Sequence, residues 1–410
     1  MNRVLIILPS TSYRAHDFIF AANKLDIELV VASDHRQALS SLLPEKSVAL
    51  NFGNPQVSLK KIRDYHRKKP FEAIIGIDEE TVVLAAMACE VLDLKSNAVS
   101  AVRATRDKHL MRGLISNAGL NSPKYELFSI FDQPERLTKN IHYPCVLKPT
   151  FLSASRGVIR VNSEKEFADA FSLIRDLLSR KDIKKKGAES ADKILKEDYI
   201  PGTEVALEGI IVDGELKVLA IFDKPDPLEG PYFIETIYVA PSRHPDEILT
   251  QTISETKHAL EAIGLATGPV HCELRLNNKG AWIIEVAARS IGGLCSRVLK
   301  FQNGVSLEEV ILRHTIGETI DHIHREEKSA GVMMIPVPKA GTLLGVRGVE
   351  KIRAIPGIYN VVISIGPGQS VTTPPMGSKY LGFIFAEGKS PEEVEQAIRE
   401  AYSLLEVDIE

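Results

Sequence analysis

The segment of residues 268–293, GPVHCELRLNNKGAWIIEVAARSIGG, constrains the fold more than any other part of the sequence. It holds two short apolar runs, residues 270–276 and 281–286, on either side of an Asn-Asn-Lys-Gly break. Asn and Gly at such a break are typical of a hairpin turn. The segment therefore predicts two adjacent antiparallel strands.

Each predicted strand carries one carboxylate among apolar residues, Glu273 in the first and Glu285 in the second. Neighbouring strands lie about 4.8 Å apart, so the hairpin can place both carboxylates side by side on one face. Two buried carboxylates repel each other unless a cation lies between them. Without a His or Cys cage, such oxygen ligands indicate Mg²⁺ held partly by substrate phosphates, with Arg289 reaching the same region. The alternative is a pair of salt-bridged carboxylates at a solvated strand edge.

The composition limits the class of protein. A chain of 410 residues is too long for one hydrophobic core, so we expect several domains. A net charge of −4 gives no reason to expect nucleic acid or an anionic membrane as a partner. No apolar run approaches the roughly 18 residues of a transmembrane helix. The four cysteines are scattered without a CxxC pair, which favours a reduced, cytoplasmic protein.

The first hundred residues alternate short apolar runs with helical patterns. The runs are residues 3–8, 28–32 and 73–77, and an Ala-rich helix is predicted after the third. This alternation predicts an open parallel sheet of Rossmann-like layout. Because the first run leads into Pro-Ser-Thr-Ser and not into a GxGxxG loop, no dinucleotide site is predicted there.

A phosphate-binding loop is suggested by residues 143–161, YPCVLKPTFLSASRGVIRV. The pattern predicts a strand ending at Lys148, a loop of small residues and a second strand. Backbone N–H groups and hydroxyls of such a loop can close over phosphoryl oxygens while the lysine supplies positive charge. The alternative is an ordinary hairpin with a lysine at its rim.

The sequence also predicts the start of one helix and the position of one linker. Thr105 is a plausible N-cap for a helix that ends near residue 117. Residues 180–193, RKDIKKKGAESADK, are charged and poor in apolar residues, which predicts a solvated linker.

Several motifs in consistent order resemble the ATP-grasp superfamily over residues 105–320. They are TRDKHLMR with Lys108, VLKP with Lys148, the SASRGV loop, EDYIPGTE at 197–204, Glu273, and EVAARSIGG at 285–293. Within the superfamily, DKPDPLEGPYFIET and the SIGG that follows EVAAR are similar to the L-amino-acid ligases, the bacilysin-synthetase-like dipeptide ligases.

The resemblance implies a multidomain fold of α/β and α+β type. An N-terminal Rossmann-like parallel-sheet domain is expected over residues 1–100. A two-subdomain ATP-grasp fold is expected over 101–190 and 191–325, with the metal site in the second subdomain. A C-terminal α+β region is expected over 326–410.

The resemblance also implies an ATP site. Its residues are Lys108, Lys148, Ser153, Ser155, Gly157, Glu197, Ile200 and Glu204. The two lysines are expected on the ATP phosphates, and the serines and glycine in the closing loop. Main-chain groups around Glu197 and Ile200 are expected to meet adenine, so side-chain substitutions there are expected to be mild. Glu204 is expected to accept hydrogen bonds from ribose.

By the same resemblance, Glu273 and Glu285 bind Mg²⁺, with Mn²⁺ as a substitute. Arg289 is expected to be the catalytic residue, stabilising charge on the transferred phosphoryl group. One departure is Ala287, where many ATP-grasp enzymes have Asn, which leaves fewer protein ligands for a second ion. The loop FLSASRG also has fewer glycines than in many relatives.

Four residues are expected to contact the substrates. Glu235 resembles the position that pairs with the ammonium group of the first amino acid, and Gly292 and Gly293 fall where substrate contacts are expected. His271 would position substrate, although a packed strand histidine explains it equally well.

The implied function is an ATP-dependent carboxylate–amine ligase, an ADP-forming carbon–nitrogen ligase. It would form an amide, expected to be a dipeptide bond between two amino acids, through an acyl phosphate. One alternative is an ATP-grasp carboxylase or other metabolite ligase, and another is a non-catalytic ATP-binding regulatory protein. The expected partners are small amino acids, with neither nucleic acid nor membrane, and a homodimer is a family-level expectation.

Overall fold

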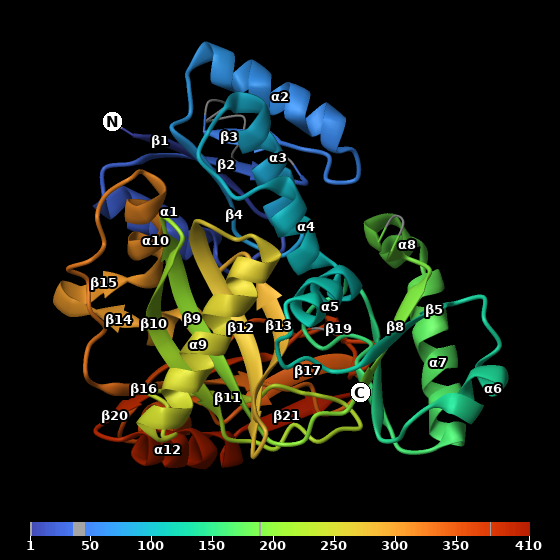
Figure 1. Cartoon of the computed structure of the whole chain (residues 1–410). Helices are drawn as coiled ribbons and strands as arrows, with labels where there is room; N and C mark the ends of the chain where they lie inside the picture. The colour runs from blue at the N-terminus through green and yellow to red at the C-terminus, as the bar shows by residue number, and fades with distance from the viewer. Residues whose placement is uncertain (1, 36–45, 188–189, 378) are drawn as a thin grey trace.

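The first sheet is open and parallel, as predicted. The computed structural model describes residues 2–35, 46–187, 190–377 and 379–410 (Figure 1). The sheet has the strand order β3-β2-β1-β4 with all strands parallel. These strands are β1 (Arg3–Ile7), β2 (Glu28–Ser33), β3 (Ser47–Ala49) and β4 (Ala73–Gly76). The helices in this region are α1 (Ala15–Lys24), α2 (Pro55–Lys68) and α3 (Val82–Leu92).

A second, smaller sheet is antiparallel with the order β5-β8-β6-β7. Its strands are β5 (Tyr125–Ser129), β6 (Cys145–Pro149), β7 (Ile159–Val161) and β8 (Lys193–Asp198). Helix α7 (Glu164–Ser179) packs the buried rings of Phe167 and Phe171 into the core that this sheet helps to form. The short helix α6 (Pro134–Leu137) lies beside α7 (Figure 1).

The linker predicted for residues 180–193 is wrong over residues 181–187, and residues 188 and 189 lie outside the described residues. Helix α8 (Lys181–Gly187) follows α7, and β8 already begins at Lys193. Ile183 is only 1% exposed and belongs to the same apolar cluster as Phe171. One buried apolar residue among charged ones is enough to dock a short amphipathic helix, which the composition alone did not reveal.

The largest sheet has eight strands in the order β13-β12-β9-β10-β11-β16-β20-β18. The strands from the middle of the chain are β9 (Thr203–Val212), β10 (Glu215–Lys224), β11 (Ile237–Ala240), β12 (Gly268–Asn277) and β13 (Gly280–Ala287), and β13 forms one edge of the sheet. The strands β16 (Ser329–Ile335), β18 (Ile358–Ile363) and β20 (Gly382–Gly388) complete it from the C-terminal part of the chain. The sheet therefore runs across the boundary expected at residues 325 and 326, and the domain boundaries remain a prediction.

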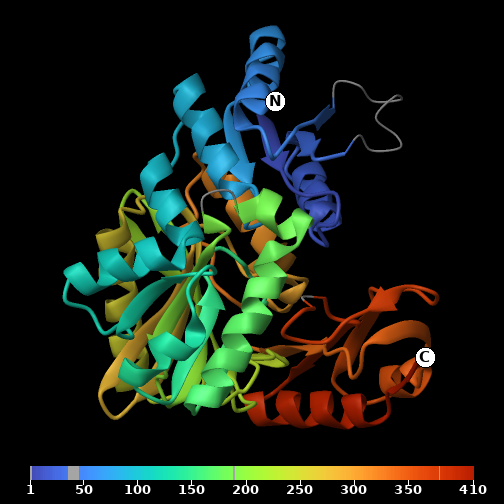
Figure 2. The same cartoon turned by 90° about the vertical axis from the view of Figure 1, so that its right-hand side faces the viewer.

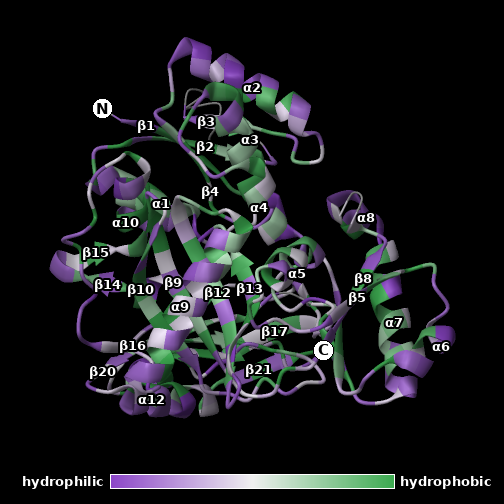
Figure 3. Cartoon of the chain, in the orientation of Figure 1, coloured by the Kyte–Doolittle hydropathy of each residue, from purple (hydrophilic) through white to green (hydrophobic). Residues whose placement is uncertain are grey.

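Both faces of this sheet are covered. Because alternate residues of a strand point to opposite faces, Leu207 packs in one core with α5 (Lys108–Asn117) and α9 (Asp246–Ile263). Ala206 packs in another core with α1 and α10 (Leu307–Thr315). Figure 3 shows hydrophobic colour along the strands, whereas α2 and α12 (Pro391–Ser403) present largely hydrophilic surfaces.

The C-terminal part of the chain adds a lobe beside the main body (Figure 2). A small sheet in it has the order β19-β17-β21, formed by β17 (Gly341–Arg347), β19 (Ser370–Val371) and β21 (Glu406–Ile409). Further short elements are α11 (Val349–Arg353), β14 (Lys300–Phe301) and β15 (Val305–Ser306). None of the helices in the described part of the chain combines the length and apolar character that a membrane crossing requires.

The helix that carries Lys108 starts later than predicted. Thr105 lies inside α4 (Val99–Arg106), and the N-cap of α5 is Asp107. Asp107 has extended backbone angles, and its carboxylate accepts hydrogen bonds from the N–H groups of His109 (2.9 Å) and Leu110 (3.4 Å). The chain therefore turns sharply between two helices, and the turn aims Lys108 inward.

We predict that Asp107→Ala lowers the free energy of unfolding by about 1 kcal/mol, because two N–H groups at the start of α5 lose their acceptor. Chemical denaturation would measure the change. Asp107→Asn is the matched control, because its amide oxygen can still accept, and it should retain most of the stability. Equal losses in both variants would contradict a capping role.

Candidate active site

Two pockets adjoin each other where the small and the large sheets meet. The first pocket, of about 90 Å³, is lined by residues of β6, β8 and the β12–β13 hairpin. The second pocket, of about 280 Å³, also reaches the carboxyl ends of β1 and β4 in the first sheet. The residues that line both pockets are Ser153, Ser155, Glu235, Glu273 and Glu285. A molecule in one pocket therefore meets a molecule in the other at these side chains.

The structure brings together most of the residues expected to bind ATP. Those that line the first pocket are Lys108, Lys148, Ser153, Ser155, Glu197, Ile200 and Glu204. Gly157 does not line it. Gly157 has a φ of +75°, and a Cβ there would lie 2.9 Å from Pro149, so the structure requires glycine for a turn and a close contact.

Lys148 is held by a buried carboxylate. Its Nζ lies 2.6 Å from Glu197, and the Nε of Arg112 donates to the same carboxylate over 2.7 Å. Burial alone would raise the pKa of Glu197, but Arg112 and Lys148 lower it to about 2. Burial lowers the pKa of Lys148, against the pull of Glu197. The Glu197 side chain therefore has a structural role, and these contacts lead us to expect a loss of stability on substitution in place of the mild effect that the resemblance implies.

Lys108 joins the start of α5 to the hairpin. Its Nζ lies 3.2 Å from Glu285 and donates to the carbonyl oxygen of Leu152 over 2.9 Å. The Lys108 side chain is buried, whereas Glu285 keeps 26% exposure and faces both pockets. A lysine in this position can bind a negatively charged group that enters the first pocket beside Glu285.

Glu204 is held by two cations on the opposite side of the first pocket. Its carboxylate accepts from Lys224 (2.8 Å) and from the Nε of Arg275 (3.1 Å). Arg275 also donates to the carbonyl oxygen of Ile200 over 2.9 Å. These contacts fix both the acidic group and the main chain of the segment expected to meet the nucleoside.

The predicted hairpin is present, and Glu273 and Glu285 are direct partners across β12 and β13. A bulge follows at once, because the next pair is Leu274 with Ile283. This irregularity changes the strand direction beside the two carboxylates. Both therefore reach the junction of the two pockets, as the hairpin pattern predicted.

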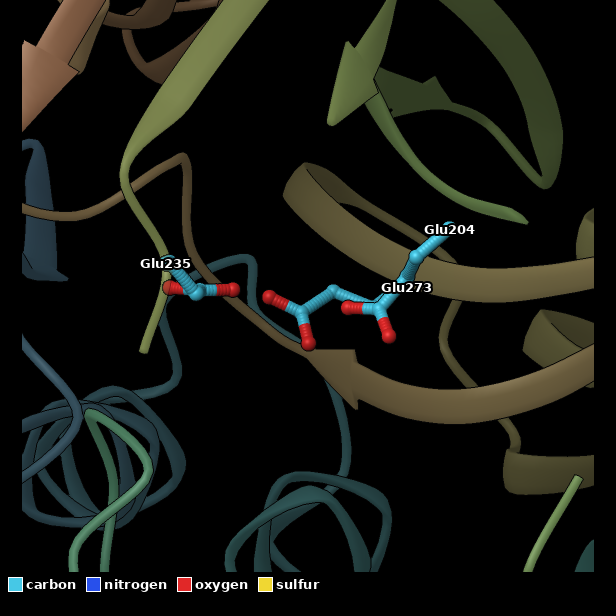
Figure 4. A group of neighbouring side chains, drawn as sticks. All are labelled: Glu204, Glu235 and Glu273. Atoms are coloured by element: carbon cyan, nitrogen blue, oxygen red, sulfur yellow. The ribbon is translucent and has the colours of Figure 1, made fainter. Parts of the chain in front are cut away.

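Three carboxylates also converge from separate elements. Oxygen atoms of Glu204, Glu235 and Glu273 lie within 4.8 Å of one another (Figure 4). The Lys224 Nζ lies among them, 2.8 Å from Glu204, 2.5 Å from Glu235 and 3.2 Å from Glu273. An oxygen-only donor set beside Glu285 suits a hard divalent cation, so the residues present fit Mg²⁺.

The titration of this cluster is uneven. Burial and the charge of Glu273 raise the pKa of Glu235 to about 7, although Lys224 opposes the change. Burial would raise the pKa of Glu273 too, but Lys224 and His271 bring it well below its usual range. Glu273 therefore stays ionised, and Glu235 is poised to exchange a proton near neutral pH.

His271 bridges two carboxylates. Its Nδ1 lies 3.1 Å from Glu208 and its Nε2 lies 3.4 Å from Glu273. Burial lowers the pKa of His271, but the two carboxylates outweigh burial and raise it to about 9. Glu208 is fully buried and also accepts from the N–H of Ile291 over 3.0 Å. His271 thus orders the hairpin and the segment that follows Arg289.

Arg289 is fixed by an acidic residue from the first sheet. Its Nη2 lies 2.8 Å from Glu79, and Nη1 donates to the carbonyl oxygen of Ser290 over 2.9 Å. Arg106 donates to the other oxygen of Glu79 over 2.6 Å. Burial would raise the pKa of Glu79, but Arg289 and Arg106 lower it to about 2.

The loop after Lys148 is attached to the C-terminal part of the chain. The N–H of Gly157 donates to Pro375 over 2.9 Å, and the Nε of Arg156 donates to Met376 over 3.0 Å. Ala154 and Ser155 both have φ near +50°, a region that costs non-glycine residues energy. In this loop Ala154 and Ser155 adopt the left-handed backbone conformation that glycines often provide, so the turn forms with few glycines.

All four residues expected to contact substrate line the second pocket, namely Glu235, His271, Gly292 and Gly293. Several other residues that line the second pocket are not predicted from the sequence, namely Tyr13, Asp78, Glu79, Tyr238, Tyr380 and Phe383. These come from segments hundreds of residues apart. The only available signal was polar residues directly after predicted parallel strands, where ligands commonly bind.

Comparison with known proteins finds similar families and structures. Residues 141–298 match the family model of the ATP-grasp domain, residues 19–94 the ATP-grasp N-terminal domain, and residues 333–410 the L-amino acid ligase C-terminal domain 2. The chain is 30% identical over 254 residues to the alanine–anticapsin ligase of Bacillus subtilis, covering 59% of this chain and 53% of that protein. It thus spans about half the length of the curated relatives that it matches first.

Solved structures share the fold over the whole chain. The L-amino acid ligase from Bacillus licheniformis superimposes with a TM-score of 0.87 at 26% identity, covering 100% of this chain and 99% of that one. N5-carboxyaminoimidazole ribonucleotide synthetase from Thermotoga maritima superimposes with a TM-score of 0.72, covering 100% of both chains. At 15% identity this second match concerns the fold alone.

We predict that Glu197→Gln lowers the free energy of unfolding by about 3–5 kcal/mol, because Lys148 and Arg112 remain buried without a countercharge. Urea denaturation would measure this. The matched control is Glu215→Gln, whose partner Lys257 is 40% exposed, and it should change stability little. A small loss in Glu197→Gln would show that the two cations find other partners.

We also predict a pH dependence from His271. A pKa raised from 6.5 to about 9 stabilises the fold fully below pH 6.5, and this stabilisation is lost as the pH rises through 9. The loss is up to roughly 3 kcal/mol. Unfolding free energies of the wild type and of His271→Gln, measured from pH 6 to 10 with chelator present, should converge at high pH. A constant difference across that range would rule out the charged imidazole.

Proposed function

We propose that this chain, an ATP-grasp protein similar to the L-amino-acid ligases, joins two amino acids at the expense of ATP. The products are an amide, ADP and phosphate. The relatives named above are the basis for the class of substrate. The proposal applies to the ATP-grasp domain and to the N-terminal and C-terminal regions of this chain that flank it.

One observation carries the proposal, namely that Glu235, Glu273 and Glu285 belong to both pockets. The first pocket holds the lysines expected on the phosphates, and the second has room for small molecules at its far side. The terminal phosphoryl group of a nucleotide in the first pocket would therefore face a carboxylate in the second. In-line transfer requires this proximity.

The reaction has two steps. A carboxylate oxygen of the first amino acid attacks the γ-phosphorus of ATP, the bond to the β-phosphate oxygen breaks, and ADP leaves with an acyl phosphate formed. The amine of the second amino acid then attacks the acyl carbon. The C–O bond breaks, phosphate departs, and the amine loses a proton to give the amide.

Glu273 and Glu285 would hold Mg²⁺, with Glu204 and Glu235 nearby. The ion supplies positive charge that screens the phosphoryl oxygens from the attacking carboxylate. For Mg²⁺ to bind, Lys224 and Lys108 must share these carboxylates with it or turn toward the nucleotide. Mn²⁺ has the same preference for oxygen ligands and is proposed as a substitute.

The other residues of the chain orient and enclose the reactants. Arg289, held by Glu79, would stabilise charge on the transferred group, and Glu235 would receive the ammonium group of the first amino acid. The loop of residues 153–157 lies against both pockets, and its contacts with Pro375 and Met376 would help to exclude water. Exclusion of water matters because an acyl phosphate hydrolyses.

The proposal extends to three features of the whole protein. The domains are drawn at residues 1–100, 101–190, 191–325 and 326–410, and a homodimer is expected. Because the four cysteines are free and buried, a reducing cytoplasm is proposed as the location.

The direct test is to measure ADP release with a panel of amino-acid pairs and to identify products by mass spectrometry. We expect ADP release that requires both amino acids and an amide of matching mass. Absence of pair-dependent ADP and amide across the panel would refute the proposal. Labelled bicarbonate appearing in product would favour a carboxylase instead.

With the active pair known, Glu285→Gln and Arg289→Met should each lower kcat about 10²–10³-fold, since each removes charge at the transferred phosphoryl group. Arg297→Met is the matched control. Arg297 pairs with Asp17 over 2.9 Å and lines neither pocket, so its loss should leave kcat unchanged. Near-normal turnover in both site variants would remove these residues from the active centre.

A further inference from the structure

A third pocket, of about 110 Å³, lies behind the catalytic segment and is separate from the two pockets above. Its walls come from α1, β4, α3, α10 and the start of β12. Segment 288–290, which contains Arg289, closes one side of it. Arg289 lines both the second and the third pockets, and the third pocket has no role in the ligase reaction proposed above.

Arg14 is the unusual residue of this pocket. It is 1% exposed and makes one ion pair, from Nη2 to Glu308 over 3.2 Å. Its Nε and Nη1 are buried and have no hydrogen-bond partner among the residues that the structure describes. The ring of Phe18 lies 5.1 Å from the guanidinium carbon and offers only partial compensation. Leaving buried donors of a charged group unpaired is costly.

The charges that line the pocket have one sign. Its charged lining residues among those described are Arg14, Lys95 and Arg289, and each pairs with a carboxylate outside the lining, Glu308, Asp213 and Glu79 respectively. The lining also contains a polar pair, in which the Nε2 of His314 accepts from the N–H of Gly268 over 3.2 Å. The other walls are largely apolar side chains of β4, α3 and α10.

We infer that the third pocket binds a small oxyanion, which accepts from the two unpaired nitrogens of Arg14. A planar guanidinium with free N–H groups suits phosphate and carboxylate alike. The volume admits a small anion of a few heavy atoms. Because segment 288–290 separates this pocket from the second one, the bound anion would also affect how Arg289 is held.

The test is calorimetric titration of the full chain with inorganic phosphate and, separately, with propionate. The first pocket is kept filled by Mg²⁺ and a non-hydrolysable ATP analogue. We expect saturable binding of at least one anion. Tighter binding of phosphate identifies the released product as the source, and tighter binding of propionate identifies an organic acid. This readout needs no turnover, so its result stands apart from that of the ligase assay.

Three variants locate the binding. Arg14→Lys keeps the charge beside Glu308 but loses the planar pair of donors, and Ala85→Leu fills the pocket from α3. Each should weaken binding at least about tenfold. Lys24→Met is the matched control, because it breaks the other ion pair between α1 and α10, Lys24 with Glu309 at 2.9 Å, outside the pocket. Its affinity should equal that of the wild type.

No saturable binding of either anion to the wild type overturns the inference. Unchanged affinity in Arg14→Lys also overturns it, since the anion would then lie elsewhere. If Arg14→Lys does not fold, Ala85→Leu decides in the same way.

Discussion

Charge compensation around the β12–β13 hairpin is the constraint on which the site depends. Glu273 and Glu285 face each other, and Glu204, Glu208 and Glu235 lie close by. Such a group of carboxylates repels itself unless cations are interleaved. The cations are supplied by Lys108, Lys224, Arg275 and His271. Lys108 and Lys224 come from α5 and β10, which the fold must hold against the hairpin, whereas Arg275 and His271 lie on β12 itself.

This arrangement links the sheets to one another as well as to the chemistry. Glu79, at the end of the first sheet, holds Arg289 from the large sheet, while Glu197 in the small sheet holds Arg112, which also donates to the carbonyl oxygen of Ile283 in β13. A buried ion pair of this kind adds little net stability but makes the loss of either partner expensive. The pairs therefore fix the relative positions of the sheets, and so the geometry where the two pockets meet.

The cations have a second property that suits a site for ATP. Lys108 and Lys224 neutralise carboxylates that fit Mg²⁺, and Lys108 also lines the pocket proposed for the nucleotide. Arrival of a metal ion and a triphosphate would add positive charge beside the carboxylates and negative charge beside the lysines. The lysines and carboxylates can then exchange partners without leaving a buried charge unpaired, so the free-energy cost of the rearrangement stays small.

Local pattern in the sequence determined the elements themselves. The hairpin with its facing glutamates and the parallel first sheet follow from apolar periodicity and turn residues, which act over a few residues. Local pattern did not predict the N-cap at Asp107, where two helices follow each other directly. It also did not predict helix α8, which packs through the single buried Ile183. Only the tertiary structure brought Glu79 to Arg289 and Arg14 to Glu308, because these pairs join residues more than two hundred positions apart. Which distant charges meet depends on how sheets pack, and no local spacing in a single sequence records that.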